Sequence, residues 1–181
     1  MYKISDDDLQ QMALNAQGKI NKIYIHWTAG HYDQVFDDYH INITKDGSMY
    51  TDTNDLTEIK NHTYHRNTGA VGIGVCCAYN ATGQNNLGPE PPTEAQLTQV
   101  TRVIAMLCVD LGLPDDIEHV MTHAEAADNK DGWYAHEPYG PDSTVERWDF
   151  DVVHEGDAPR SGGNWLRGTA RWHAAQWGSN I

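Results

Sequence analysis

The apolar run over residues 70–80, AVGIGVCCAYN, limits the possible folds of this chain more than any other segment. Valine, isoleucine and small residues follow one another almost without a polar interruption. A strand with one face in water would alternate between apolar and polar residues, so the run predicts a central strand that is buried on both faces. Such a strand belongs inside a sheet that other layers cover.

Three further segments are predicted to supply neighbouring strands. KIYIHW, residues 22–27, is a short apolar strand that ends in a histidine and a tryptophan. Residues 39–51 alternate around KDGS, in which Gly47 allows the backbone angles of a hairpin turn. IEHVMTH, residues 117–123, is a short strand or extended segment.

Helices are predicted between and after these strands. Residues 5–17 form a short helix with Ser5 as its N-cap. A longer helix follows Thr93, which makes a capping-box pattern with Gln96 and precedes apolar residues at helical spacing up to Gly112. Residues 164–177 form a C-terminal helix. With no internal repeat and no linker, the pattern predicts one α/β domain over residues 1–181.

Composition excludes several classes of function. The 181 residues carry a net charge of −14, which argues against nucleic acid and against attraction to anionic surfaces. No apolar run approaches the ~20 residues that span a bilayer, and the N-terminus has no apolar signal core, so we expect no membrane partner and synthesis in the cytoplasm. The three cysteines are expected to be buried free thiols rather than a disulfide framework.

Two histidines end apolar segments in the same way, and they raise the question of a metal site. His26 and His123, together with Asp149 in RWDF, could form a catalytic zinc site with an open fourth position. No compact motif such as H-E-x-x-H joins them, so spacing alone favours structural histidines over ligands. Glu125 and His136 are alternative ligands in the polar region 124–146.

The order of four motifs changes this balance, because it resembles the type-2 N-acetylmuramoyl-L-alanine amidases. That family includes phage lysis amidases and the animal peptidoglycan recognition proteins. Its H-x-[ST]-A segment matches His26, Thr28 and Ala29. Its Y-H-[FI]-x-I-x-x-D-G segment matches Tyr39, His40, Ile41, Ile43, Asp46 and Gly47. Its H-x-x-x-x-N-x-x-[SA]-[IV]-G-[IV] segment matches His62, Asn67, Ala70, Val71, Gly72 and Ile73. In the fourth, a histidine follows the long helix, as His123 does, and an aspartate or cysteine lies two residues after a lysine, as Asp149 lies after Arg147.

The resemblance implies a fold, an activity and a set of site residues. The implied fold is a mixed central sheet with helices on both sides and Zn²⁺ in a surface groove. The implied reaction is hydrolysis of the amide bond between N-acetylmuramic acid and L-alanine in peptidoglycan or muropeptides. The implied zinc ligands are His26, His123 and Asp149; the implied catalytic groups are Tyr39 and Arg147; the implied substrate contacts are His62, Asn67 and Trp27.

The chain departs from the family pattern in three places. The interval between His26 and Tyr39 is short, and the interval between His123 and Asp149 is long. Arg147 stands where the family has a lysine two residues before the third ligand. Gly74 stands where some members carry a catalytic glutamate.

These features favour a phage or prophage lysis enzyme that acts on the cell wall after release. We expect residues 1–181 to be its single catalytic domain, with no separate wall-binding domain. Three alternatives remain open at the level of sequence. They are a non-catalytic peptidoglycan-binding module, a cytoplasmic amidase that recycles muropeptides, and an unrelated hydrolase with coincidental histidines.

Overall fold

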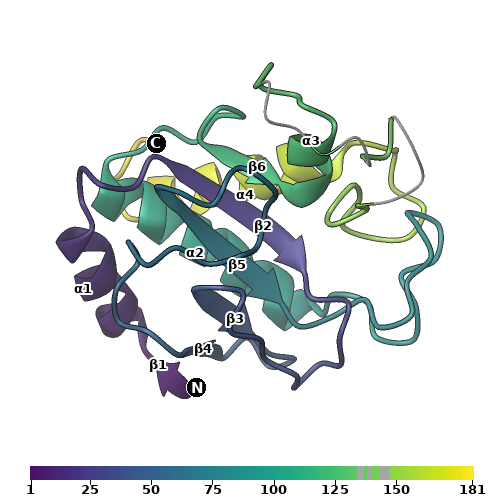
Figure 1. Ribbon diagram of the computed structural model, residues 1–181, viewed down its shortest axis with the longest axis horizontal. Helices are drawn as coiled ribbons and strands as arrows, with labels where there is room; N and C mark the ends of the chain where they lie inside the picture. Colours follow the sequence, from purple (N-terminus) through teal and green to yellow (C-terminus); the bar gives the residue numbers. More distant parts are fainter. Residues whose placement is uncertain (134–136, 138–139, 143–146) are drawn as a thin grey trace.

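A mixed sheet forms the centre of the molecule in the computed structural model, which describes residues 1–133, 137, 140–142 and 147–181. In that part of the chain the sheet has six strands in the order β1-β4-β3-β5-β2-β6 (Figure 1). The inner strands β3, β5, β2 and β6 are parallel, and β4 and β1 extend the sheet antiparallel at one edge. The strands are β1 (Tyr2–Ile4), β2 (Lys22–Trp27), β3 (Ile41–Ile43), β4 (Met49–Thr51), β5 (Ala70–Val75) and β6 (Val120–Thr122).

Four helices accompany the sheet in the described residues. They are α1 (Asp6–Asn15), α2 (Glu94–Leu111), α3 (His123–Ala127) and α4 (Gly162–Gln176). The long helix α2 packs against α1, α4 and the strands β3 and β5. Short α3 continues directly from β6 and contacts β2 (Figure 1). Among the described residues, no helix is both long enough and apolar enough to cross a bilayer.

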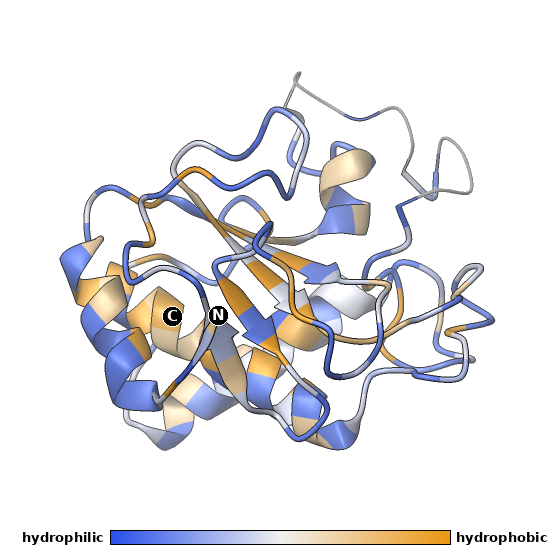
Figure 2. Ribbon diagram, turned by 60° about the horizontal axis from the view of Figure 1, so that its bottom comes forward, coloured by the Kyte–Doolittle hydropathy of each residue, from blue (hydrophilic) through white to orange (hydrophobic). Residues whose placement is uncertain are grey.

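The two faces of the sheet have different surroundings. On β2, Ile23, Ile25 and Trp27 belong to the large core cluster that includes α2, whereas Tyr24 belongs to a smaller cluster with Met121 on the opposite face. Figure 2 shows the hydrophobic residues gathered on the strands and in stripes along the helices. The even-numbered residues of β2 therefore point away from the α2 layer, toward the loops and α3.

The fold class predicted from the sequence is confirmed. All six residues of β5 are buried, and the strand lies between β3 and β2. The hairpin turns at Gly47 with φ +86°, and both predicted helix caps are complete capping boxes, at Ser5 and Thr93.

One predicted element boundary is wrong. His123 does not end an extended segment; it is the first residue of α3. The reason is Thr122, whose hydroxyl accepts a hydrogen bond from the backbone N–H of Glu125 at 3.1 Å and caps the new helix. His26 likewise lies inside β2, one residue before its end.

Candidate metal centre

Strand register brings the two predicted histidine ligands together. Ile25 of β2 pairs with Thr122 of β6 in parallel register, so the next residue of each chain segment is His26 and His123. His26 follows Tyr24 by two positions and His123 follows Met121 by two, so both histidines lie on the face of the sheet opposite α2. The imidazoles meet at the carboxyl end of neighbouring parallel strands.

Asp149 reaches the same place from a tightly held turn. Its carbonyl oxygen accepts a hydrogen bond from Ala124 N–H at 3.4 Å, and the next residue, Phe150, is fully buried against Trp27. Any side chain at Gly162, the first residue of α4, would collide with the Phe150 carbonyl oxygen. The turn is therefore fixed between α3 and α4, and it directs Asp149 toward the histidines.

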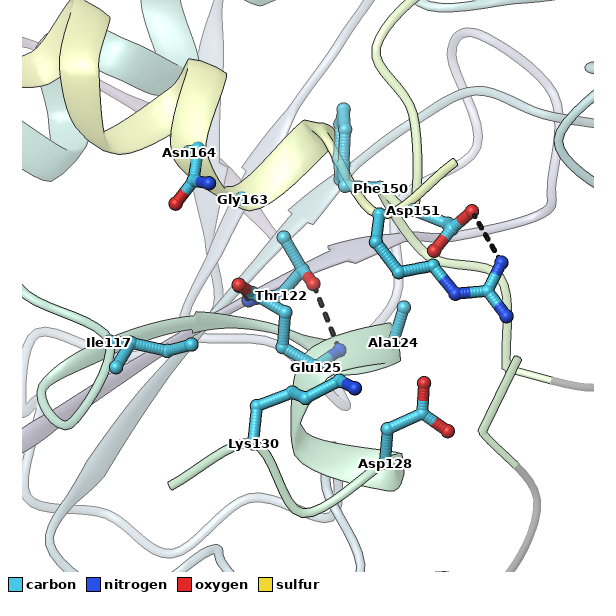
Figure 3. A pocket seen from close by; sticks show the side chains of 11 residues that line it. Ile117, Thr122, Ala124, Glu125, Asp128, Lys130, Phe150, Asp151, Gly163 and Asn164 are labelled. Carbon is cyan, nitrogen blue, oxygen red and sulfur yellow. Dashed lines mark hydrogen bonds and ion pairs between the residues drawn. The ribbon is translucent and has the colours of Figure 1, made fainter. Parts of the chain in front are cut away.

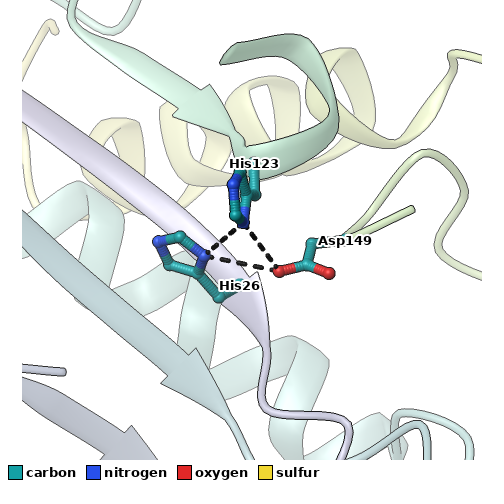
Figure 4. A group of neighbouring side chains, drawn as sticks. All are labelled: His26, His123 and Asp149. Atoms are coloured by element: carbon teal, nitrogen blue, oxygen red, sulfur yellow. Dashed lines mark hydrogen bonds and ion pairs between the residues drawn. The ribbon is translucent and has the colours of Figure 1, made fainter. Parts of the chain in front are cut away.

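The three side chains converge through single atoms (Figure 4). His26 Nδ1 lies 3.1 Å from His123 Nδ1, and Asp149 Oδ2 lies 3.3 Å from each of these nitrogens. Ligand atoms around a tetrahedral zinc ion are separated by roughly 3.3–3.5 Å when each lies about 2.0–2.2 Å from the metal. The spacing and the donor set of two imidazoles and one carboxylate therefore fit zinc.

Burial and charge act in opposite directions within this cluster. Burial lowers the pKa of His26 to about 4, so its imidazole is neutral at pH 7. Burial also acts to lower the pKa of His123, but hydrogen bonds to Asp149 and Glu137 outweigh it and raise the pKa to about 9. Burial acts to raise the pKa of Asp149, yet its two histidine partners hold the pKa below the usual range. Asp149 is therefore ionised and His26 neutral at pH 7, the protonation states in which a carboxylate and an imidazole bind a metal.

A groove of about 640 Å³ opens beside the cluster. Its lining comprises Asp38, Tyr39, Asn61, His62, Thr63, Tyr64, His65, Asn67, His123, Glu137, Arg147 and Asp149. Four residues predicted to act on substrate are among them, namely Tyr39, His62, Asn67 and Arg147. The structure therefore gathers them around the candidate metal ligands, although they come from separate segments.

The comparisons with known proteins agree with this arrangement. The model of the family "N-acetylmuramoyl-L-alanine amidase" (Amidase_2) matches residues 16–135, about two thirds of the chain. The chain belongs to the N-acetylmuramoyl-L-alanine amidase family. The match includes His26 and His123 but ends before Asp149, so the place of Asp149 in the cluster depends on the geometry. No curated protein matches the chain significantly.

Solved structures with some likeness to the chain include an amidase and two PGRPs. The endolysin N-acetylmuramoyl-L-alanine amidase LysCS from Clostridium intestinale is 20% identical, with a TM-score of 0.44 over 59% of this chain and 70% of that one. Drosophila PGRP-LB is 19% identical, with a TM-score of 0.45 over 60% of this chain and 72% of its own. PGRP-Hd from Alvinella pompejana is 15% identical, with a TM-score of 0.40 over 59% and 73%.

Within this amidase-family chain, two glycines of β5 make room for groove residues. A Cβ at Gly72 would lie 2.6 Å from the imidazole of His62, and one at Gly74 would overlap the ring of Tyr39. The glutamate that some family members carry at the position of Gly74 is therefore sterically incompatible with Tyr39 as placed here. The two aromatic rings occupy the space that such a side chain needs.

Gly74→Ala should destabilise the fold, because the new methyl group must displace the Tyr39 ring or shift β5. Overpacking of this kind typically costs about 1–3 kcal/mol of unfolding free energy. Urea denaturation would measure it. Gly168→Ala is the matched control, since a Cβ at Gly168 in α4 would meet only the Arg171 guanidinium, at 3.9 Å, and this variant should gain about 0.5–1 kcal/mol. Equal stability of Gly74→Ala and wild type would contradict the packing argument.

His62 and Asn67 shape the groove wall through internal hydrogen bonds. Asn67 Oδ1 accepts from the backbone N–H groups of His62 and Thr63, at 3.1 and 2.8 Å. The His62 Nδ1 lies 2.9 Å from the Thr63 hydroxyl. The asparagine therefore holds the loop that presents His62, and a direct contact of either residue with substrate stays a prediction.

The structure does not place Trp27 in the groove, where the sequence predicted a contact with substrate. It is 4% exposed and packs in the α2-side core against Phe150, with ring centroids 5.6 Å apart, instead of lining the groove. Side chains alternate along a strand, so the residue after His26 must point to the opposite face. Neighbouring positions in a motif do not share a surface when the motif lies on a strand.

The alternative ligand Glu125 has a structural role. Its carboxylate accepts two hydrogen bonds from Arg167 of α4, at 2.8 and 2.7 Å. Glu125 lines a separate cavity between α3 and the start of α4 (Figure 3). This cavity has a volume of about 190 Å³, and a side chain at Gly163 would collide with the Glu125 carboxylate. This ion pair fixes α3, the helix that begins with His123. His136, the other alternative, lies outside the described residues.

Two residues next to the candidate metal ligands were not predicted from the sequence. Glu137 Oε2 lies 3.0 Å from His123 Nε2, and the Thr63 hydroxyl lies 3.2 Å from His26 Nε2. Each ligand histidine thus directs Nδ1 toward the cluster and holds its other nitrogen through a polar partner. Thr63 follows His62 of the third motif but is not one of its defined positions, and Glu137 belongs to no motif, so no local pattern identified either.

Proposed function

We propose that this protein is a zinc-dependent hydrolase that cleaves the amide bond between N-acetylmuramic acid and L-alanine in peptidoglycan. The observation that carries the proposal is the convergence of His26 Nδ1, His123 Nδ1 and Asp149 Oδ2 at separations of 3.1–3.3 Å beside a groove. Membership of the amidase family supports this choice of substrate and bond. Three protein ligands leave a fourth position open for chemistry.

His26, His123 and Asp149 would hold the zinc ion. When bound, zinc would supply a Lewis acid for the amide carbonyl and a nucleophile from water at neutral pH. The chain's own residues must then orient the amide and stabilise the charge that develops on its oxygen.

Tyr39 is suited to donate a hydrogen bond at this site. Its ring centroid lies 5.2 Å from that of His26. Burial, and to a lesser degree the nearby charge of Asp149, raises the pKa of its hydroxyl, so the phenol keeps its proton at neutral pH. A protonated phenol at the groove can donate to the carbonyl oxygen as that oxygen becomes negative.

Arg147 supplies a fixed positive charge. Its side chain is 41% exposed at the groove, and its Nε donates to Glu137 at 3.0 Å, which limits its orientation. A guanidinium stays protonated at all ordinary pH values, so Arg147 can stabilise an oxyanion but cannot act as a general acid. In this respect the chain differs from family members with lysine at the same place.

The cellular role that we propose is lysis by a phage or prophage, with intact wall as the substrate. A recycling amidase would instead prefer soluble muropeptides. A binding module has no need of three converging ligand atoms, so the complete cluster favours an enzyme over a non-catalytic module.

Digestion of purified wall tests the bond that is cut. We expect new L-alanine amino termini without new reducing sugar ends, because an amidase leaves glycosidic bonds intact. A parallel digest of soluble muropeptides gives the preference between wall and fragments. Protein treated with a chelator is the blank. Reducing ends without amino termini would make the protein a glycosidase and refute the proposed function.

A further inference from the structure

We propose that Glu137 is a positioning residue that fixes the tautomer of His123 and the direction of Arg147 at the same time. The inference rests on the proposed function, since it assigns a role to Glu137 in holding a zinc ligand. It concerns a residue in the long interval between His123 and Asp149, outside the residues that the family motifs contain.

One carboxylate joins three parts of the site. Glu137 Oε2 lies 3.0 Å from His123 Nε2 and 3.0 Å from Arg147 Nε. Its Oε1 accepts a hydrogen bond from the backbone N–H of Tyr64, which also lines the groove, at 3.3 Å. Glu137 is only 9% exposed, so these contacts form away from bulk water. Its hydrogen bonds are therefore stronger than they would be on the surface.

The contact with His123 determines which nitrogen can bind a metal. An imidazole that binds a metal is neutral, and a carboxylate at Nε2 accepts a hydrogen bond from that nitrogen, so the single proton of zinc-bound His123 would reside on Nε2. The lone pair of Nδ1 then points toward His26 and Asp149 (Figure 4). A carboxylate in this position also raises the basicity of the ligand, and loss of such a partner typically lowers metal affinity 10–100-fold.

The geometry separates this role from that of a general base. The contact of Glu137 is with Nε2, whereas His26 Nδ1 and Asp149 Oδ2 both meet His123 at Nδ1, on the other side of the imidazole. Both carboxylate oxygens already have partners. Glu137 therefore acts on the reaction through His123 and Arg147.

Zinc affinity is the primary measurement. Metal-free Glu137→Ala and Glu137→Gln would be titrated with zinc in competition with a chromophoric chelator at pH 7. We expect Glu137→Ala to weaken zinc binding 10–100-fold. Glu137→Gln should recover part of the loss, because its amide oxygen can still accept the proton of His123 Nε2. It also keeps the test valid if Glu137→Ala does not fold.

Asp142→Asn is the matched control. It removes one negative charge from the same region of the chain, but the partners of Asp142 are Lys130 and Arg160 rather than the zinc ligands. Its zinc affinity should stay within about twofold of wild type. Equal affinities of all Glu137 variants and wild type would refute the proposal, while absence of zinc from the wild type would refute the proposed function instead.

Turnover at saturating zinc tests the contact with Arg147. If Glu137 acts through Arg147, then Glu137→Gln should lower kcat in the wild type but hardly lower it further in an Arg147→Ala background. The loss of zinc affinity should persist in both backgrounds. Multiplicative losses of kcat, or a large loss of kcat with unchanged zinc affinity, would mean that Glu137 acts on the substrate directly and would overturn the positioning role.

Discussion

His26→Ala and His123→Ala should each remove the bound zinc and with it the amidase activity. Each change deletes one of three atoms that lie 3.1–3.3 Å apart, and the remaining two cannot hold a catalytic zinc ion in place. Asp149→Ala should have the same effect, although the family match ends before it. Elemental analysis of untagged wild-type protein should give about one zinc per chain.

The expected loss of turnover exceeds that of an ordinary active-site change. Removing a single oxyanion donor typically costs roughly 10²–10³-fold in kcat. Removing a ligand takes away both the Lewis acid and the source of the nucleophile, so the loss in kcat should be larger than that range. Muramoyl-peptide turnover, measured with and without added zinc, gives the comparison.

His31→Ala is the control for removal of a histidine. His31 has an exposed side chain and pairs with Glu90 at 2.6 Å, and it is not among the residues that line the groove. Its variant should keep full zinc and full turnover. Zinc retained by Asp149→Ala but lost from Glu125→Ala would show that the third ligand has been assigned to the wrong carboxylate.

Local signals in the sequence predicted most of the fold. The buried strand β5, the turn at Gly47 and the caps at Ser5 and Thr93 each depend on residues within a few positions of one another. The start of α3 was missed although its signal was present: Thr122 and Glu125 have capping-box spacing. The apolar residues before His123 indicate a strand, and that pattern masks the helix start that the cap creates.

The site was predictable only where it coincided with motifs. His26, His123, Asp149, Tyr39 and Arg147 came from the resemblance, and the structure gathers them around one groove. Strand alternation in β2 places Trp27 on the face opposite His26, so the alternation itself argues against a contact of Trp27 with substrate. Pairings between distant segments leave no periodic signal, so the contacts of Glu137 required the structure.

A second large effect is expected from a buried ion pair that joins the groove wall to the segment after α3. Arg66 Nη1 and Nη2 donate to the two oxygens of Asp131, at 2.8 and 3.1 Å, with 3% and 4% of the side chains exposed. Asp131→Ala should cost about 3–5 kcal/mol of unfolding free energy, because it leaves the Arg66 guanidinium buried without its carboxylate. Urea denaturation at pH 7 measures the loss.

An exposed ion pair provides the contrast. Arg102 and Asp6 lie 2.6 Å apart with 32% and 45% of their side chains exposed, so Asp6→Ala should cost only about 0–1 kcal/mol. A loss of similar size in Asp6→Ala and Asp131→Ala would contradict the importance given to burial.

The effect of Asp131→Ala should depend on pH in a definite direction. Burial acts to raise the pKa of Asp131, but hydrogen bonds from Arg66 and from the backbone of Trp133 outweigh it and lower the pKa from 3.8 to about 2. A carboxyl group with a lowered pKa in the folded state stabilises the fold above its unfolded pKa and loses this contribution as pH falls toward the folded value. The stability difference between wild type and Asp131→Ala should therefore be constant from pH 7 to pH 5 and shrink below pH 4.

Removing both Arg66 and Asp131 separates the contribution of the ion pair to stability from the cost of leaving one charge unpaired. Arg66→Met combined with Asp131→Ala leaves no buried guanidinium, so the double variant should be more stable than Asp131→Ala alone. Arg66 belongs to the same loop as His62 and Thr63, and Thr63 holds His26 at 3.2 Å. A double variant that regains stability but binds zinc more weakly than wild type would mean that the ion pair serves to position the loop beside the zinc ligands. A double variant less stable than Asp131→Ala would instead mean that Arg66 stabilises the fold through its other contacts, with Asn129 and Tyr24.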